Sequence, residues 1–76
     1  MAMVYLLINT LKDYEGSVLS HLKVIPEVQW ATPVQGRYDI IACLKCDDME
    51  EMKNTISKKI RRYSGIVRTT TTIVAE

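Results

Sequence analysis

The sequence predicts an α+β sandwich in which strands and helices follow one another in the order β-α-β-β-α-β. Three observations lead to this prediction. Four short runs are rich in β-branched, aromatic and aliphatic residues, which is typical of strands. Two longer segments have apolar residues at intervals of three and four, which is typical of amphipathic helices. The chain has 76 residues, so we assign residues 1–76 to a single domain.

The first strand and the first helix follow directly from the amino terminus. We expect a strand over Met3–Asn9, an apolar run that we interpret as buried on both faces. We expect a helix over Asp13–Ile25, because one apolar stripe there has helical spacing. The members of that stripe are Tyr14, Val18, Leu22 and Ile25. Asp13 is placed to cap the helix, and Pro26 prevents it from continuing.

Two strands joined by a short turn at Gly36-Arg37 are expected next. The first is Val28–Gln35, which must lie at a sheet edge or a bulge because Pro33 has no N–H for a central ladder. The second is Tyr38–Lys45, and it is apolar on both of its faces. Ile40, Ala42 and Leu44 share one face, and Ile41 and Cys43 share the other. Both faces should therefore be covered.

The second half of the chain repeats the helix-then-strand pattern. We expect a helix over Asp47–Arg61, with Asp47 and Glu50 at the spacing of a capping box. Its apolar stripe consists of Met49, Met52, Ile56 and Ile60. Gly65 is suited to a left-handed turn after this helix. The last strand is expected over Ile66–Val74, which is rich in threonine.

This order of elements, with right-handed crossovers, gives a ferredoxin-like βαββαβ sandwich: a four-stranded antiparallel sheet with two helices on one face. Two helices cover only one face of the sheet. The other face is also apolar at its centre, and so small a domain is difficult to stabilise alone. We therefore predict a homodimer, dimerising through the sheets.

Composition and charge exclude several classes of protein. The formal net charge is +1, which gives no basic field for direct DNA binding. The apolar run Met1–Ile8 is too short to span a membrane and lacks the pattern of a signal peptide. The two cysteines are too few for a disulfide scaffold. We expect a cytoplasmic protein that binds neither DNA nor a membrane.

The residues that most often carry catalysis have simpler explanations here. Cys43 and Cys46 form a CxxC, but within a strand they point to opposite faces, so we interpret them as packing residues. His21 is the only histidine, and we expect it at the surface or partly packed rather than acting as a catalytic base. The basic cluster at residues 58–62 follows an acidic helix start, as the helix dipole favours. We expect no catalytic residue, no metal ion and no cofactor.

Two polar segments have both a structural and a functional explanation. Gly36-Arg37-Tyr38-Asp39 is either a plain hairpin connection or a ligand loop, in which Asp39 could pair with an ammonium group. The four threonines Thr69–Thr72 suit a solvated strand, or could present two hydroxyls from one face to a small polar ligand.

These two segments resemble motifs of a known family. Pro33–Ile41 resembles the G-x-Y-D strand-start motif of the leucine-responsive regulatory protein/AsnC family. Gly65–Thr71 resembles its G-V-x-x-T-x-T final strand, and Leu22–Val28 its helix exit. The likeness covers about residues 2–75, which correspond to the effector-binding module of the family, called RAM for regulation of amino acid metabolism.

The resemblance implies a ferredoxin-like dimer, often assembled into a ring of four dimers, an octamer, with a free amino acid held between dimers. Carried over by position, Gly36, Tyr38 and Asp39 match the ligand loop, with Arg37 at its variable position. Thr69 and Thr71 match the ligand strand. Asp39 would hold the α-ammonium and the two threonines would supply hydroxyls, while Tyr38 shapes the pocket.

The chain also departs from the family pattern. Ser64 stands where a proline is usual, and Lys12-Asp13 where Pro-Gly is common. The family's regulators carry a helix-turn-helix before this module, so we expect a stand-alone RAM module that acts indirectly in transcription regulation of amino-acid metabolism. Its partners would be copies of itself and full-length regulators of the family. The alternatives are a small dimeric α+β barrel enzyme, which would rely on His21 or Tyr14, and an assembly partner without a ligand.

Overall fold

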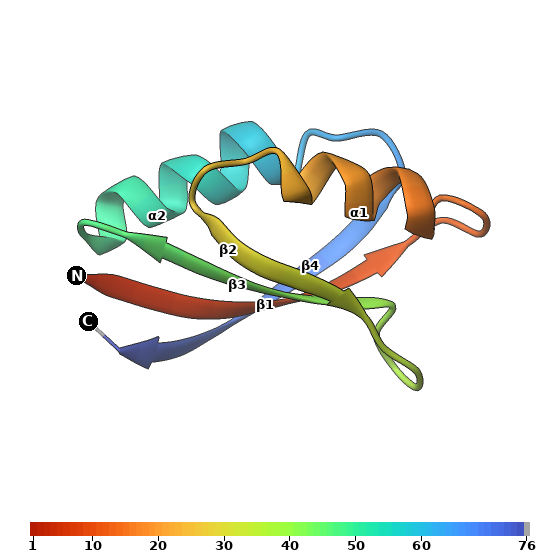
Figure 1. Cartoon of the computed structure of the whole chain (residues 1–76), viewed down its shortest axis with the longest axis horizontal. Helices are drawn as coiled ribbons and strands as arrows, with labels where there is room; N and C mark the ends of the chain where they lie inside the picture. The colour runs from red at the N-terminus through yellow and green to blue at the C-terminus, as the bar shows by residue number, and fades with distance from the viewer. Residues whose placement is uncertain (76) are drawn as a thin grey trace.

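A four-stranded antiparallel sheet carries both helices on one face in the computed structural model, which describes residues 1–75 (Figure 1). The strands are β1 (Ala2–Thr10), β2 (Val28–Pro33), β3 (Ile40–Cys46) and β4 (Ile66–Ala75). The helices are α1 (Glu15–Lys23) and α2 (Met49–Thr55), and α2 continues as a π-helical turn, η1 (Ile56–Ile60). The strand order is β2-β3-β1-β4. This confirms the predicted ferredoxin-like fold and places Pro33 on an edge strand.

The core lies between the sheet and the two helices. Buried and more exposed residues alternate along strand β1, and its buried side chains are Ala2, Val4, Leu6 and Ile8. Strand β3 contributes Ile40, Ala42 and Leu44 to the same side, as the sequence predicted. The helical stripes supply Val18, Leu22, Met52, Ile56 and Ile60. Tyr14 is the exception in its stripe, because it precedes α1 and is 41% exposed.

The two strands of the central hairpin are shorter at the turn than predicted. Strand β2 ends at Pro33 rather than Gln35, and β3 begins at Ile40 rather than Tyr38. The reason lies in Asp39, whose N–H donates to the carbonyl oxygen of Ile8 at 2.9 Å while its carboxylate bonds to Thr10. These contacts hold Asp39 against the end of β1 and out of the regular ladder.

Both predicted helix caps were wrong by one residue. Asp13 does not cap α1: it has a φ of +70° in the turn before the helix, and Tyr14 occupies the N-cap without a side-chain hydrogen bond. Asp48, not Asp47, caps α2. Its Oδ1 accepts the backbone N–H of Glu51 at 2.8 Å, so the expected Asp-to-Glu spacing is used one residue later.

The second helix ends in a wide turn that the sequence did not indicate. The N–H of Arg61 donates to the carbonyl oxygen of Ile56 at 2.8 Å, which is the i to i+5 bond of a π-helix. Ile56 and Ile60 are both buried in this turn, so the predicted apolar stripe is kept. No helix among the described residues is long and apolar enough to cross a membrane.

The face of the sheet opposite the helices, which we call the open face, is only partly covered in a single chain. Strand β1 is therefore not fully buried on this side, where Tyr5 is 39% exposed and Leu7 is half-buried. The Tyr5 and Trp30 rings lie 5.8 Å apart between centroids, and both residues pair with Cys43 across the sheet. Cys43 is thereby 4% exposed, and burial raises the pKa of its thiol.

The cysteines follow the geometric argument made from the sequence. Cys43 lies on the open face, whereas Cys46 is buried on the helix side, where its Sγ is 3.8 Å from the Met52 Sδ. Both thiols are free. They are packing residues, as expected.

An ion pair joins the turn before β2 to η1, and it makes the stability of the fold depend weakly on pH. Lys59 Nζ lies 3.0 Å from Glu27 Oε2, and this hydrogen bond holds the pKa of the Glu27 carboxyl below its ordinary value of 4.5. The ion pair therefore contributes its full stabilisation at pH values above the pKa that Glu27 has in the unfolded chain. This contribution is lost as the pH falls through the lowered pKa of Glu27 in the folded chain.

Replacing Glu27 with glutamine is expected to reduce the free energy of unfolding by less than about 1 kcal/mol at neutral pH, because Lys59 is half-exposed. Urea unfolding as a function of pH measures this, and the difference from the parent should vanish at acidic pH. Lys59→Gln should give a similar loss, and the double variant should lose little more than either single one. A difference that persists unchanged at low pH would contradict the assignment.

Candidate functional site

The loop predicted to bind ligand is anchored to the end of β1. Asp39 Oδ2 accepts the backbone N–H of Thr10 at 2.8 Å and lies 3.4 Å from its hydroxyl. One residue earlier on β1, the side-chain Nδ2 of Asn9 donates to the carbonyl oxygen of Arg37 at 2.7 Å. Gly36 has a φ of +107°, which favours glycine, and turns the chain between β2 and β3.

A hollow of about 380 Å³ lies beside this loop. It is lined by Asn9, Arg37, Tyr38, Val67 and Arg68. Two of the six predicted site residues, Arg37 and Tyr38, therefore meet the beginning of β4 across the end of β1. The volume is at the lower end of the roughly 300–1,000 Å³ of small-molecule pockets, which suits a ligand of amino-acid size.

A bulge in β4 explains why two consecutive residues face the same hollow. Asn9 pairs with Arg68, but Thr10 pairs with Ile66, so Val67 is the extra residue on this strand. Neighbouring side chains of a regular strand point to opposite faces. The bulge breaks that alternation and presents Val67 and Arg68 together.

The two predicted threonines lie elsewhere in the single chain. Thr69 pairs with Ile8 and Thr71 with Leu6, which places both on the helix side of the sheet. Thr71 lines a separate hollow of about 340 Å³ beside α2 and η1, together with Lys53, Asn54, Ile56, Ser57 and Arg61. Thr70 and Thr72 lie on the open face, opposite Leu7 and Tyr5. One chain thus does not bring the loop and the threonines into one hollow.

Asn9, Val67 and Arg68 were not predicted as site residues. Asn9 carried a weak signal, because it is a polar residue at the end of an apolar strand. Val67 and Arg68 carried none, since strand alternation from Ile66 would place them on opposite faces. The bulge that joins them depends on the pairing of β4 with β1.

His21 has a structural role in this fold. Its Nε2 donates to the carbonyl oxygen of Lys59 at 2.7 Å, and its ring stacks on Tyr63 with centroids 3.9 Å apart. The hydroxyl of Tyr63 lies 2.7 Å from the Ser17 hydroxyl. These contacts tie α1 to η1 and to the segment that follows it.

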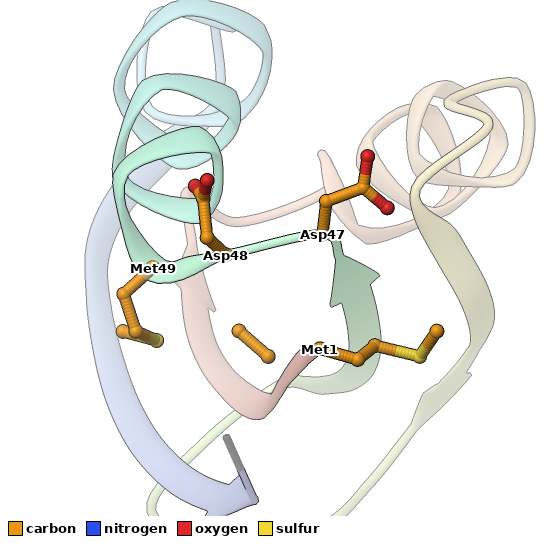
Figure 2. Close-up of a pocket in the computed structure, with 5 residues that line it drawn as sticks. Met1, Asp47, Asp48 and Met49 are labelled. Carbon is orange, nitrogen blue, oxygen red and sulfur yellow. The ribbon is translucent and has the colours of Figure 1, made fainter.

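The acidic residues before α2 line a hollow at the other end of the sheet (Figure 2). This hollow has a volume of about 150 Å³ and includes Met1, Asp47, Asp48 and Met49. Figure 2 shows the Asp47 and Asp48 carboxylates directed away from the side chains of Met1 and Met49. Among residues 1–75, no group of three or more His, Cys, Asp or Glu side chains is placed to hold a metal ion.

Comparison with known proteins identifies relatives of this fold and sequence. The family model of the Lrp/AsnC ligand binding domain matches residues 3–76. A comparison with curated proteins gives no match.

Three similar solved structures differ in how much of their own length is matched. FFRP-DM1 is 32% identical with a TM-score of 0.95, and the match covers 99% of this chain and 100% of that one. The hypothetical protein PHS023 from Pyrococcus horikoshii is 32% identical with a TM-score of 0.94, over 100% and 92% of the two chains. The transcriptional regulator NMB0573 from Neisseria meningitidis, solved as an L-Met complex, is 14% identical with a TM-score of 0.89. That match covers 99% of this chain but 50% of the regulator.

Proposed function

The chain belongs to the Lrp/AsnC ligand-binding domain family, and from this premise we propose that it binds a free amino acid and assembles in response to it. The observation that carries the proposal is the hollow beside the Gly36–Asp39 loop, where the family's loop motif meets β4. The L-Met complex of the Neisseria regulator supports an amino acid as the class of ligand, because that protein has the same fold.

In this proposal, the ligand lies where two copies of the chain meet. The hollow has protein on one side and is open to solvent on the other, so a second subunit is needed to enclose the ligand. Asp39 binds the α-ammonium through Oδ1, because Oδ2 already accepts from Thr10. Tyr38 shapes the pocket, Gly36 keeps the loop backbone accessible, and Thr69 and Thr71 of a neighbouring copy supply hydroxyls.

The proposed assembly begins with a homodimer through the open face. This face has an apolar centre that includes Tyr5, Leu7, Trp30 and Ile41. Dimers then associate into a ring in which the amino acids lie between dimers. The module acts in transcription regulation in the cytoplasm, without direct DNA contact, by assembling with copies of itself or with full-length regulators of the family.

We propose no catalytic activity for the chain. The alternative of an enzyme required a role for His21 or Tyr14. The His21 imidazole is engaged by Lys59 and Tyr63, and Tyr14 lies in the turn before α1 against Gly65. These contacts favour structural roles for both residues.

Isothermal titration with each of the twenty amino acids tests the proposal, and at least one of them should bind. Asp39→Asn should weaken that binding by about 10-fold or more, because a charge-assisted hydrogen bond contributes about 1.5–3 kcal/mol. The asparagine side chain still has an oxygen that can accept from Thr10, so the loop should remain in place.

Asp47→Asn is the matched control, because Asp47 is exposed and lies at the other end of the sheet. It should leave binding unchanged. Light scattering on the same samples should detect a change in mass when the ligand is added. Absence of binding by all twenty amino acids would refute the ligand proposal.

A further inference from the structure

Two arginines dominate the charge of the hollow beside the Gly36–Asp39 loop. Arg37 and Arg68 both line it, together with the neutral residues Asn9, Tyr38 and Val67. None of the five lining residues is acidic. Within residues 1–75 neither guanidinium belongs to an ion pair, since the ion pair found there joins Lys59 to Glu27. The lining of the hollow therefore carries two positive charges, which exceed the single negative charge that Asp39 of the adjoining loop brings to the proposed site.

The backbone of both arginines is anchored to the strands beside the hollow. The carbonyl oxygen of Arg37 accepts from Asn9 Nδ2 at 2.7 Å, and the neighbouring Asp39 is bound to the end of β1. Arg68 pairs with Asn9 in the ladder, next to the bulge at Val67. Asn9 is thus the common neighbour of both arginines. A side chain built on such anchored backbone loses less entropy on binding than one on a free loop.

We propose that this hollow selects an amino acid with an acidic side chain, aspartate or glutamate, by pairing its two carboxylates with Arg37 and Arg68. The inference rests on the proposed function and specifies the chemical class of its ligand. A planar guanidinium binds a carboxylate through two parallel hydrogen bonds, so each arginine suits one carboxylate. The amide of Asn9 and the hydroxyl of Tyr38 are further donors for the same oxygens.

A neutral amino acid satisfies only one of the two arginines. Its α-carboxylate pairs with one guanidinium, and the second is then enclosed between subunits without a counter-charge. An unpaired charge that loses its water is strongly unfavourable, so the hollow discriminates against neutral side chains as well as attracting acidic ones. Basic amino acids are disfavoured further by repulsion.

The sharpest comparison uses ligands of equal shape and different charge. Titration calorimetry of the whole chain with L-glutamate and L-glutamine, and with L-aspartate and L-asparagine, isolates the side-chain carboxylate. Each acid should bind at least about 10-fold more tightly than its amide, the scale of a hydrogen bond between charged groups. Added salt should weaken the binding of the acids more than that of the amides.

Variants connect this preference to the two residues. Arg68→Gln and Arg37→Gln should each reduce the preference for glutamate over glutamine toward equality. Arg62→Gln is the matched control, because Arg62 lines a different hollow with His21 and Tyr63. This variant should prefer glutamate over glutamine to the same extent as the parent. Circular dichroism and unfolding in urea check that each variant is folded.

The outcomes separate this inference from the proposed function. If a neutral amino acid binds while aspartate and glutamate do not, the inference fails and the proposed function stands. If none of the twenty amino acids binds, both fail. 2-Oxoglutarate, which has two carboxylates but no ammonium group, should bind more weakly than glutamate; equal affinity would overturn the assignment to an amino acid.

Discussion

Replacing Gly65 with alanine is expected to lower the free energy of unfolding by about 2–4 kcal/mol, because two unfavourable effects add. Gly65 has a φ of +103°, where a Cβ clashes with its own backbone. The added Cβ would also lie 2.5 Å from Cδ2 of Tyr14 and 3.0 Å from its Cβ and Cγ. Two of these three atoms are close to the Tyr14 backbone, so a rotation of the ring alone does not relieve the overlap.

The other glycines provide matched controls for the two effects. Gly36 has a φ of +107° but nothing within 4 Å of an added Cβ, so Gly36→Ala should cost only the backbone strain, about 1–2 kcal/mol. Gly16 lies in α1 with open space around it, so Gly16→Ala should stabilise by up to about 1 kcal/mol.

Urea unfolding at one fixed protein concentration measures all three variants, since any assembly makes stability depend on concentration. Relative to Tyr14→Ala alone, adding Gly65→Ala should cost less than it does in the parent, because the overlap with Cγ and Cδ2 of Tyr14 is gone and only the 3.0 Å contact with Cβ remains. Equal losses for Gly65→Ala and Gly36→Ala would show that the Tyr14 ring moves aside at no cost.

Replacing Leu7 with aspartate is expected to abolish the proposed homodimer. Leu7 lies on a central strand, on the open face, and pairs with Ile41 and Thr70. In a dimer joined through this face, the new carboxylate would be enclosed among apolar side chains without a partner. The cost is several kcal/mol in each subunit, which is comparable to the free energy that holds a small dimer together.

Sedimentation velocity measures the effect as a fall from the mass of the dimer to that of one chain. Val24→Asp is the control, because Val24 is 76% exposed at the end of α1 and belongs to neither face of the sheet. It should leave the mass unchanged. A Leu7→Asp variant that sediments like the parent would place the interface elsewhere on the molecule.

Periodicity was sufficient to predict the elements and the core. Strand β1 buries alternate residues, and each helix buries one stripe, so the patterns of Val4, Leu6 and Ile8 and of Val18 and Leu22 could be recognised directly. The element boundaries were less well predicted where side chains compete for backbone groups. Asp39 leaves the ladder to bind Thr10, and Asp48 rather than Asp47 accepts the N–H of Glu51 in the first turn of α2.

The candidate site could be predicted only in part, because two of its five lining residues are brought there by strand pairing. Arg37 and Tyr38 were found through the loop motif, which is continuous in sequence. Arg68 joins them only because Val67 is bulged, and a bulge depends on contacts with another strand rather than on local sequence. The threonines were placed correctly on a strand, but in one chain the sheet directs Thr69 and Thr71 away from the loop.

The irregular pairing at the ends of β4 has a consequence for the uniqueness of the fold. Thr69–Thr72 is a run of identical residues, and such a strand could slide along β1 while exchanging one threonine for another. The pairing shifts at Asn9/Thr10 and at Met3/Val4, so an irregularity brackets the threonine run on each side. A slipped strand would have to move both irregularities along β1 and break the 2.8 Å hydrogen bond from the Leu11 N–H to the Gly65 carbonyl oxygen. The repetitive strand is thereby locked into a single alignment.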